Sequence, residues 1–134
     1  MIQRWPWLIA GAAGAGAVVM GVLTVQPPAS TQHPDPRPGV TAERVLPPSV
    51  VPNAPGAAEA YAAARNVPQV LDGLHCHCEC AKHFGHRSLL TCFESDHASR
   101  CDICMGEAVL AAGLASRGAS LDAIRRAIDE RFKS

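Results

Sequence analysis

Aromatic side chains are scarce in this 134-residue chain, which has two tryptophans, one tyrosine and three phenylalanines. Hydrophobic residues make up 48% of the chain, but many of them are alanine, so a large and tightly packed core is not expected. Small domains with so little bulk usually need disulfides or a bound metal ion to stay folded. The length leaves room for one such domain plus appendages.

An excess of charge of either sign is also missing, because twelve lysines and arginines balance twelve acidic residues. Without a basic stripe that would attract a phosphate backbone, nucleic acid is not a predicted partner. The sequence has no phosphate-binding loop, no serine–histidine–acid arrangement and no paired carboxylates in a catalytic context. Glu107 is interpreted as an exposed helix residue. We therefore predict no enzymatic activity.

Charged residues are absent from Leu8 to Val25, a run of eighteen residues preceded by Arg4, Trp5 and Trp7. That length and the flanking tryptophans are typical of one membrane pass with its N-terminus inside. No convincing small-x-small cleavage site follows Val25, so an uncleaved anchor is preferred to a cleaved signal. We predict a single-pass transmembrane helix within residues 1–25, with the C-terminal part of the chain extracytoplasmic at the cell membrane.

Proline dominates residues 26–56, where nine of thirty-one residues are proline and no apolar periodicity is visible. Such chains favour extended polyproline II and act as semi-stiff spacers. We predict a disordered linker over residues 26–56. A small, mainly α-helical, cysteine- and histidine-rich domain is predicted to follow over residues 57–134.

Three helices are predicted in this domain from local signals. The alanine-rich segment 57–66 favours a helix that ends before Pro68. A second helix is predicted from about Ala98 to Arg117, with Ser95 and Asp96 as candidate caps and Gly118 as the stop. In the last helix, capped by Ser120, four apolar residues recur at helical spacing and are predicted to face the core: Leu121, Ile124, Ile128 and Phe132.

All six cysteines lie between Cys76 and Cys104, and five of the six histidines lie between residues 75 and 97. The run 75–80 (HCHCEC) alternates thiols with other polar groups. An extended backbone would place its three cysteines on one side, with about 6.6 Å between successive Cα atoms. That distance lies at the upper edge of disulfide geometry. Convergence of the three thiolates on one ion is therefore preferred to a disulfide within the run.

A second cluster is predicted at a helix start, because His97, Cys101 and Cys104 share one helical face at spacing i, i+4 and i+7. His86 and Cys92 lie between the two clusters, while His33 and His83 are interpreted as strays. The spacing does not match the common zinc fingers. The predicted metal ligands are Cys76, Cys78, Cys80, His86, Cys92, His97, Cys101 and Cys104.

Residues 74–134 resemble a bacterial family named for its PCYCGC motif, whose members are extracytoplasmic lipoproteins or membrane-anchored proteins without an assigned biochemical role. His75, His77 and Glu79 replace the Pro, Tyr and Gly of the motif, and no lipidation cysteine lies near the predicted anchor. The resemblance supports the module and its location rather than an activity. It rests on Cys76, Cys78, Cys80, Gly85-His86, Cys92-Phe93, Asp96-His97-Ala98, Cys101, Cys104, Glu107-Ala108, Ile124-Arg125 and Ile128-Asp129.

Three functions fit this pattern, and metal binding is preferred because it explains the thiols and the histidines together. Disulfide stapling of an interaction module is the main alternative, since six cysteines outside the cytoplasm can form three bridges. Thiol–disulfide exchange at Cys101-Asp102-Ile103-Cys104 is the third, but the βαβ context of thioredoxin-like enzymes is missing.

The metal is predicted to be soft. The excess of sulfur favours copper(I), with zinc as the alternative for a purely structural site. The predicted role is to hold copper for, or hand it to, a membrane cuproprotein such as a respiratory oxidase. A structural zinc site would instead staple an interaction module of a membrane complex.

Overall fold

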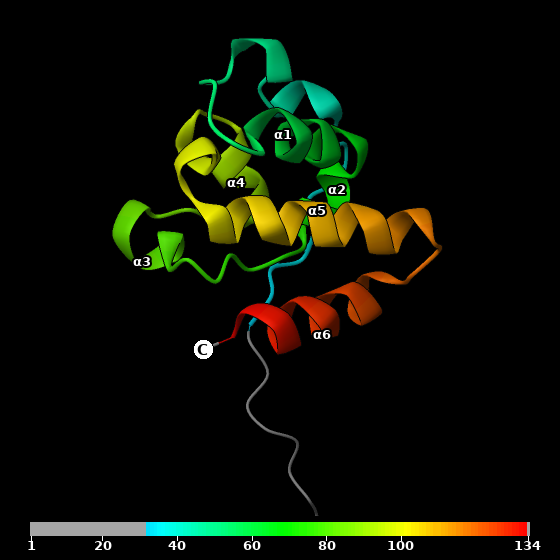
Figure 1. The fold of residues 1–134 in the computed structure, drawn as a ribbon. Coiled ribbons are helices and arrows are strands. Elements are labelled where there is room, and N and C mark those ends of the chain that lie inside the picture. Colours follow the sequence, from blue (N-terminus) through cyan, green and yellow to red (C-terminus); the bar gives the residue numbers. More distant parts are fainter. Residues whose placement is uncertain (1–31, 134) are drawn as a thin grey trace, which may run out of the picture.

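The computed structural model describes residues 32–133, which form a mainly helical unit without strands in that range (Figure 1). Three short 3-10 helices, η1 (Ala42–Arg44), η2 (Pro48–Val50) and η3 (His97–Arg100), accompany the α-helices. The α-helices are α1 (Ala57–Asn66), α2 (Pro68–Asp72), α3 (Cys80–Phe84), α4 (Leu89–Phe93), α5 (Asp102–Ser116) and α6 (Leu121–Phe132).

Helix α5 is the central element, with α1, α2 and α4 on one side and α6 on the other (Figure 1). The turn between α5 and α6 contains Gly118 at φ +82°, a left-handed conformation that glycine adopts without strain. Helix α6 begins where the Ser120 side chain accepts a hydrogen bond from the backbone N–H of Ala123. The predicted stop after α5 and the predicted start of α6 are therefore confirmed.

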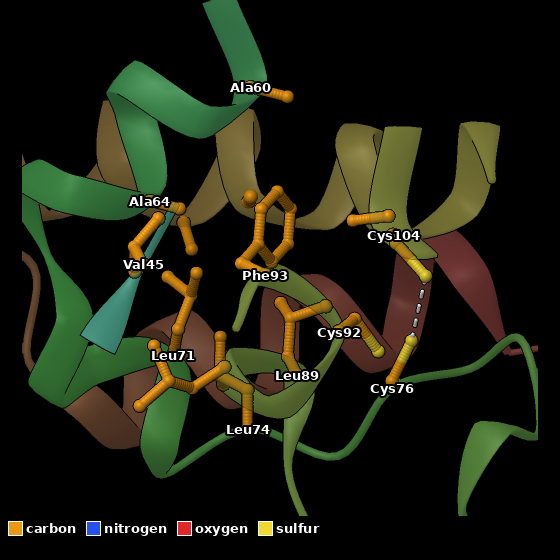
Figure 2. Close-up of a cluster of buried hydrophobic side chains, with 14 of the residues drawn as sticks. Val45, Ala60, Ala64, Leu71, Leu74, Cys76, Leu89, Cys92, Phe93 and Cys104 are labelled. Atoms are coloured by element: carbon orange, nitrogen blue, oxygen red, sulfur yellow. Dashed lines mark hydrogen bonds between the residues drawn. The ribbon is translucent and has the colours of Figure 1, made fainter. Parts of the chain in front are cut away.

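The apolar core lies between α1, α4 and α5, and Figure 2 shows part of it. The Tyr61 and Phe93 rings meet edge to face with centroids 4.9 Å apart, and the Tyr61 hydroxyl donates to the Ser95 carbonyl oxygen at 2.6 Å. Ile124 and Ile128 from α6 are fully buried, as predicted. Cysteines form one end of this core, so the sulfur atoms are held by the same packing as the apolar side chains.

The predicted disordered linker is wrong for residues 32–56, which pack against the helices as part of the folded unit. Val40 and Val45 are buried, and the backbone N–H of Leu46 donates to the Phe93 carbonyl oxygen at 3.0 Å. The Arg65 guanidinium, on α1, donates to the Ala42 and Val45 carbonyl oxygens at 2.8 and 2.6 Å. The prolines permit this extended path because each lacks an N–H that would need a partner.

A buried carboxylate joins the same segment to α2 and α4. Asp72 has no exposed surface, and it accepts hydrogen bonds from the backbone N–H and the side chain of Arg37, the shortest at 2.7 Å. Arg87 and Ser88 donate to its Oδ1 at 2.9 and 3.1 Å. Because a buried charge is tolerated only when it is fully paired, this network fixes the position of residue 37 on the domain.

The predicted membrane anchor in residues 1–25 lies outside the described residues. Among the helices from residue 32 to 133, none has both the length and the apolar character needed to span a bilayer.

Candidate metal centre

The cysteine run does not adopt the extended conformation expected from its alternating pattern. Glu79 has φ +63°, and it is the one non-glycine residue with positive φ between residues 32 and 133. The chain therefore turns at Glu79 and enters α3 at Cys80, which brings the Cα atoms of Cys78 and Cys80 to 5.6 Å. The Cα separation of Cys78 and Cys80 is therefore shorter than the expected value of about 6.6 Å. Residue 79 is the position that glycine occupies in the PCYCGC motif.

Cys78 and Cys80 form a disulfide, and the other four cysteines are free thiols. The expectation that neighbouring cysteines of the run would not pair is therefore wrong, because the turn at Glu79 shortens their separation to a normal disulfide span. The alternative of three disulfides is not what the structure contains. Cys101 and Cys104, which the redox alternative would pair, are both free.

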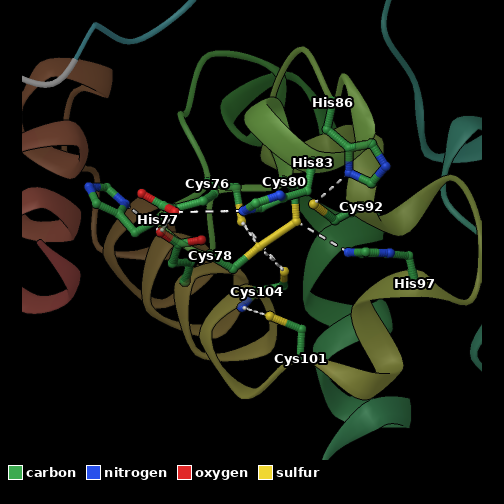
Figure 3. The surroundings of a disulfide bond; sticks show 12 residues. Cys76, His77, Cys78, Cys80, His83, His86, Cys92, His97, Cys101 and Cys104 are labelled. Carbon is green, nitrogen blue, oxygen red and sulfur yellow. Dashed lines mark hydrogen bonds and ion pairs between the residues drawn. A yellow bond between two sulfur atoms is a disulfide. The ribbon is translucent and has the colours of Figure 1, made fainter. Parts of the chain in front are cut away.

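The sulfur atoms of five cysteines gather around one point, where α3, α4 and α5 meet (Figure 3). The Cys76 sulfur lies 3.2 Å from that of Cys78 and 3.4 Å from that of Cys104, and the Cys78 and Cys104 sulfurs are also 3.4 Å apart. Cys80 and Cys92 complete a set whose sulfur atoms all lie within 4.8 Å of one another. All except Cys78 are buried.

Two imidazoles face the same sulfurs from another side. His97 Nε2 lies 3.2 Å from the Cys80 sulfur, and His86 Nδ1 lies 3.2 Å from the Cys92 sulfur. The two rings meet edge to face with centroids 4.8 Å apart, and the Phe84 ring packs on His97 in the same way. Cys80, His86, Cys92 and His97 thus form a second set of four donors within 4.8 Å of one another.

Cys101 is the predicted ligand that the structure leaves outside both sets. The predicted helix from residue 98 is interrupted, because η3 ends at Arg100 and α5 begins at Asp102. Cys101 is the N-cap of α5, and its sulfur accepts the backbone N–H of Cys104 at 3.3 Å. The break moves its side chain off the predicted face shared with His97 and Cys104.

A pocket of about 370 Å³ opens beside the sulfur cluster. It gives a path from solvent to the half-buried Cys78 and to the edge of the histidine set. Phe84, which is 64% exposed, stands in its wall. The pocket is lined by Cys78, Cys80, Phe84, His97, Arg100 and Cys101.

Hydrogen bonding among three of the thiols lowers the pKa of one and raises the pKa of the other two. Hydrogen bonds with Cys104 and Cys92 lower the pKa of Cys76, against the effect of burial. The shared bond to Cys76 raises the pKa of Cys104. For Cys92 the bond with Cys104 acts downward, but Cys76 and burial outweigh it and raise the pKa. A thiolate at Cys76 is therefore stabilised by neighbouring S–H donors.

Behind the sulfurs lies a polar network that the sequence analysis missed. The His77 ring lies between two carboxylates, with Nδ1 2.6 Å from Glu107 Oε1 and Nε2 3.0 Å from Asp129 Oδ1. Its hydrogen bond with Glu107 raises the pKa of His77. Burial raises the pKa of Glu107 to about 8. Glu107 is fully buried, so its interpretation as an exposed residue is wrong; its position one turn after Cys104 on the same helical face was the available signal.

His33 is not a stray residue. Its Nδ1 accepts the backbone N–H of His75 at 3.0 Å, and its Nε2 lies 3.2 Å from Asp129 Oδ1 without hydrogen-bond geometry. The N-terminal segment thereby supports the first residue of the cysteine run. His83, in contrast, is largely exposed and lies 3.8 Å from the Glu79 carboxylate.

The fold and the site define a small helical protein whose clustered thiols and imidazoles could hold a metal ion. The chain belongs to the family described as "Protein of unknown function with PCYCGC motif", which matches residues 29–134. That range includes the proline-rich segment that packs on the helices. No curated protein and no solved structure matches the chain.

Proposed function

We propose that the reduced protein binds a soft metal ion through its clustered cysteines and histidines, and that this ion is copper(I). The observation that carries the proposal is the gathering of five cysteine sulfurs within 4.8 Å, four of them buried. Thiolates select soft ions. In a tetrahedral site with metal–sulfur bonds of about 2.3 Å, the length found for zinc, the ligand sulfurs lie about 3.8 Å apart. The sulfurs of Cys76, Cys78 and Cys104 lie 3.2 to 3.4 Å apart, so these three need only a small expansion.

Reduction of the Cys78–Cys80 bond belongs to this proposal, because the metal ligand is a thiolate. In the oxidised form the site keeps Cys76, Cys92 and Cys104 as available sulfurs. Copper affinity is therefore expected to be higher in the reduced protein than in the oxidised one.

A zinc-stapled interaction module is the second candidate. It is favoured by one specific observation, since Cys80, His86, Cys92 and His97 supply two sulfurs and two nitrogens within 4.8 Å. Such a set suits a closed tetrahedral zinc ion, which stabilises a small domain and whose removal unfolds it.

The role proposed for copper is storage or delivery at the membrane surface, outside the cytoplasm. The apolar run from Leu8 to Val25 supports an anchor, and the pocket beside Cys78 supports ligand exchange with an acceptor such as a membrane cuproprotein.

Competition for copper(I) and zinc tests the function. The full-length chain, reduced with a phosphine, is titrated with each ion in the presence of a chromophoric chelator. We expect it to take copper(I) from the chelator, and we expect Cys92→Ser to weaken binding by about tenfold or more. His83→Asn is the control, because His83 lies outside both donor sets. Failure to compete for either ion would refute metal binding.

Metal transfer separates delivery from stapling. The copper-loaded protein is mixed with an apo copper acceptor, and circular dichroism is recorded before and after the metal is removed. Delivery predicts transfer with the helices retained. Loss of helix on stripping, together with no transfer, would favour the zinc-stapled module.

A further inference from the structure

We propose that the site holds two soft metal ions rather than one, joined by the thiolates of Cys80 and Cys92. This inference rests on the proposed metal binding and specifies its stoichiometry. Its basis is that the two donor sets share these two cysteines. Neither set alone accounts for all the donors gathered at this point of the fold.

The number of donors exceeds what one ion can use. The two sets contain seven different residues, five cysteines and two histidines. A tetrahedral ion takes four ligands, so one ion would leave several buried thiols and imidazoles without a role. Two four-coordinate ions that share two bridging thiolates require six donors, and the two sets supply seven. A second cation also offsets the charge of buried thiolates, which is costly when it is uncompensated.

The arrangement of the side chains divides them between two ions. In Figure 3 the sulfurs of Cys80 and Cys92 lie between two groups of donors. The thiols of Cys76, Cys78 and Cys104 are on one side, and the rings of His86 and His97 are on the other. One ion would be held mainly by thiolates and the other by two imidazoles and the bridging sulfurs.

The distances on the histidine side are slightly shorter than those that a second ion needs. His97 Nε2 and His86 Nδ1 each lie 3.2 Å from one of the two bridging sulfurs. A tetrahedral ion with Zn–S and Zn–N bonds of ordinary length separates a sulfur from a nitrogen by about 3.6 Å. Small outward movements of the rings would therefore admit an ion. The two ring nitrogens and the two sulfurs already lie within 4.8 Å of one another.

Both bridging positions lie in helices and are buried. Cys80 begins α3 and Cys92 lies in α4, and their exposed fractions are 2% and 0%. Cys92 belongs to the same buried cluster as Leu89 and Phe93, so water has little access to the bridge. In the oxidised protein Cys80 is bonded to Cys78 and cannot bridge. The two-ion form is therefore restricted to the reduced protein.

Stoichiometry and metal–metal scattering test the inference on the full-length, phosphine-reduced chain. We expect two equivalents of copper(I) to remain bound against the chelator and after desalting, with a copper–copper vector in the X-ray absorption fine structure. The double variant His86→Asn/His97→Asn is expected to keep one equivalent and to lose that vector. His83→Asn is expected to keep both, and circular dichroism checks that each variant is folded.

Cys92→Ser gives a second, independent test, because it removes a bridge without removing a terminal donor from either side. It is expected to abolish the copper–copper vector if one ion remains, and to weaken or lengthen it if two remain, because Cys80 alone would then join them. One equivalent in the unmodified protein, or two equivalents with an unchanged vector in the histidine double variant, would overturn the two-ion inference while leaving metal binding intact. No bound copper at all would instead refute the proposed function.

Discussion

Glu79 occupies a left-handed backbone conformation, which is unfavourable for residues that carry a Cβ atom. Its φ of +63° costs a side-chain-bearing residue roughly 1 kcal/mol or more, whereas glycine adopts it freely. The Glu79→Gly variant is therefore expected to raise the free energy of unfolding by about 0.5 to 1 kcal/mol, the greater freedom of unfolded glycine offsetting part of the gain. Chemical denaturation of the reduced protein measures the change.

Glu79→Ala is the matched control for this change. It removes the carboxylate, whose contacts with Lys82 and His83 are exposed, but it keeps the Cβ atom and hence the strain. We expect no gain from alanine. Equal stabilisation by alanine and glycine would show that the carboxylate, rather than the backbone angle, is the unfavourable feature.

Asp72 gives the fold a defined dependence on acid. Burial acts to raise the pKa of Asp72, but the hydrogen bonds from Arg37 and Ser88 outweigh it and lower the pKa below the usual value. A lowered pKa means that the stabilisation is complete above the unfolded pKa, near 3.8, and is lost as pH falls through the folded pKa. At neutral pH, Asp72→Asn is expected to cost about 3 kcal/mol, since it leaves buried donors without their charged partner.

The stability difference between the original protein and Asp72→Asn should be constant near neutral pH and shrink as pH falls below the unfolded pKa, near 3.8. Denaturation curves at several pH values measure it, and histidine titration cancels because both proteins share it. Asp122→Asn is the control, since the Asp122 side chain is 75% exposed and its contact with Arg125 is worth little. A pH-independent difference would show that charge on Asp72 does not stabilise the fold.

At the level of elements, the helices that sequence predicts well are those with local signals at both ends. The segment 57–66 has ten residues rich in alanine and a proline after it, and α1 has those bounds. Helix α6 has a serine cap and one apolar face, and its buried residues are the predicted Ile124 and Ile128. In both cases neighbouring residues alone decide the conformation.

The start of α5 could not be predicted in this way. The segment 98–117 has helical propensity throughout, yet the chain forms η3 and begins a new helix at Asp102. The deciding contact is made by Cys101, whose sulfur accepts the backbone N–H of Cys104 and so caps the N-terminus of α5. Serine or aspartate more often occupies this N-cap position. The turn at Glu79 was missed because glutamate rarely adopts positive φ, and the one signal for it was the glycine of the PCYCGC motif at this position.

The candidate site was predictable in membership but not in geometry. The concentration of cysteine and histidine pointed to all seven residues of the two donor sets, whereas the eighth predicted ligand, Cys101, lies outside both. What sequence could not supply was their division into two overlapping sets, because that depends on how α3 and α4 pack against α5. The contacts of His77 with Glu107 and Asp129 join residues 30 and 52 positions apart, beyond any local pattern.

At the scale of the whole molecule, the proline-rich segment from residue 32 belongs to the folded unit. It contributes Val40 and Val45 to the core, the acceptors for Arg65, and the partner of Asp72. Composition predicted a linker because prolines prevent regular hydrogen bonding. Buried valines and long-range polar contacts instead hold the segment on the helices, and amino-acid composition does not reveal such contacts.

Val45 and Val50 provide a matched test of this role within one short segment. Val45 is 1% exposed and Val50 is 63% exposed, so replacing each by alanine removes the same atoms from opposite environments. Val45→Ala is expected to lower the free energy of unfolding by about 2 kcal/mol, whereas Val50→Ala should change it by less than about 0.5 kcal/mol. Denaturation of the reduced protein compares the two.

Removal of the whole proline-rich segment is a larger test. A chain that begins at residue 57 lacks the buried Val40 and Val45 and the arginine partner of Asp72. It should lose roughly 5 kcal/mol of its free energy of unfolding, which is most of the stability of a small domain. A chain that begins at residue 32 should keep it. Equal stability of the chains that begin at residues 32 and 57 would restore the linker interpretation.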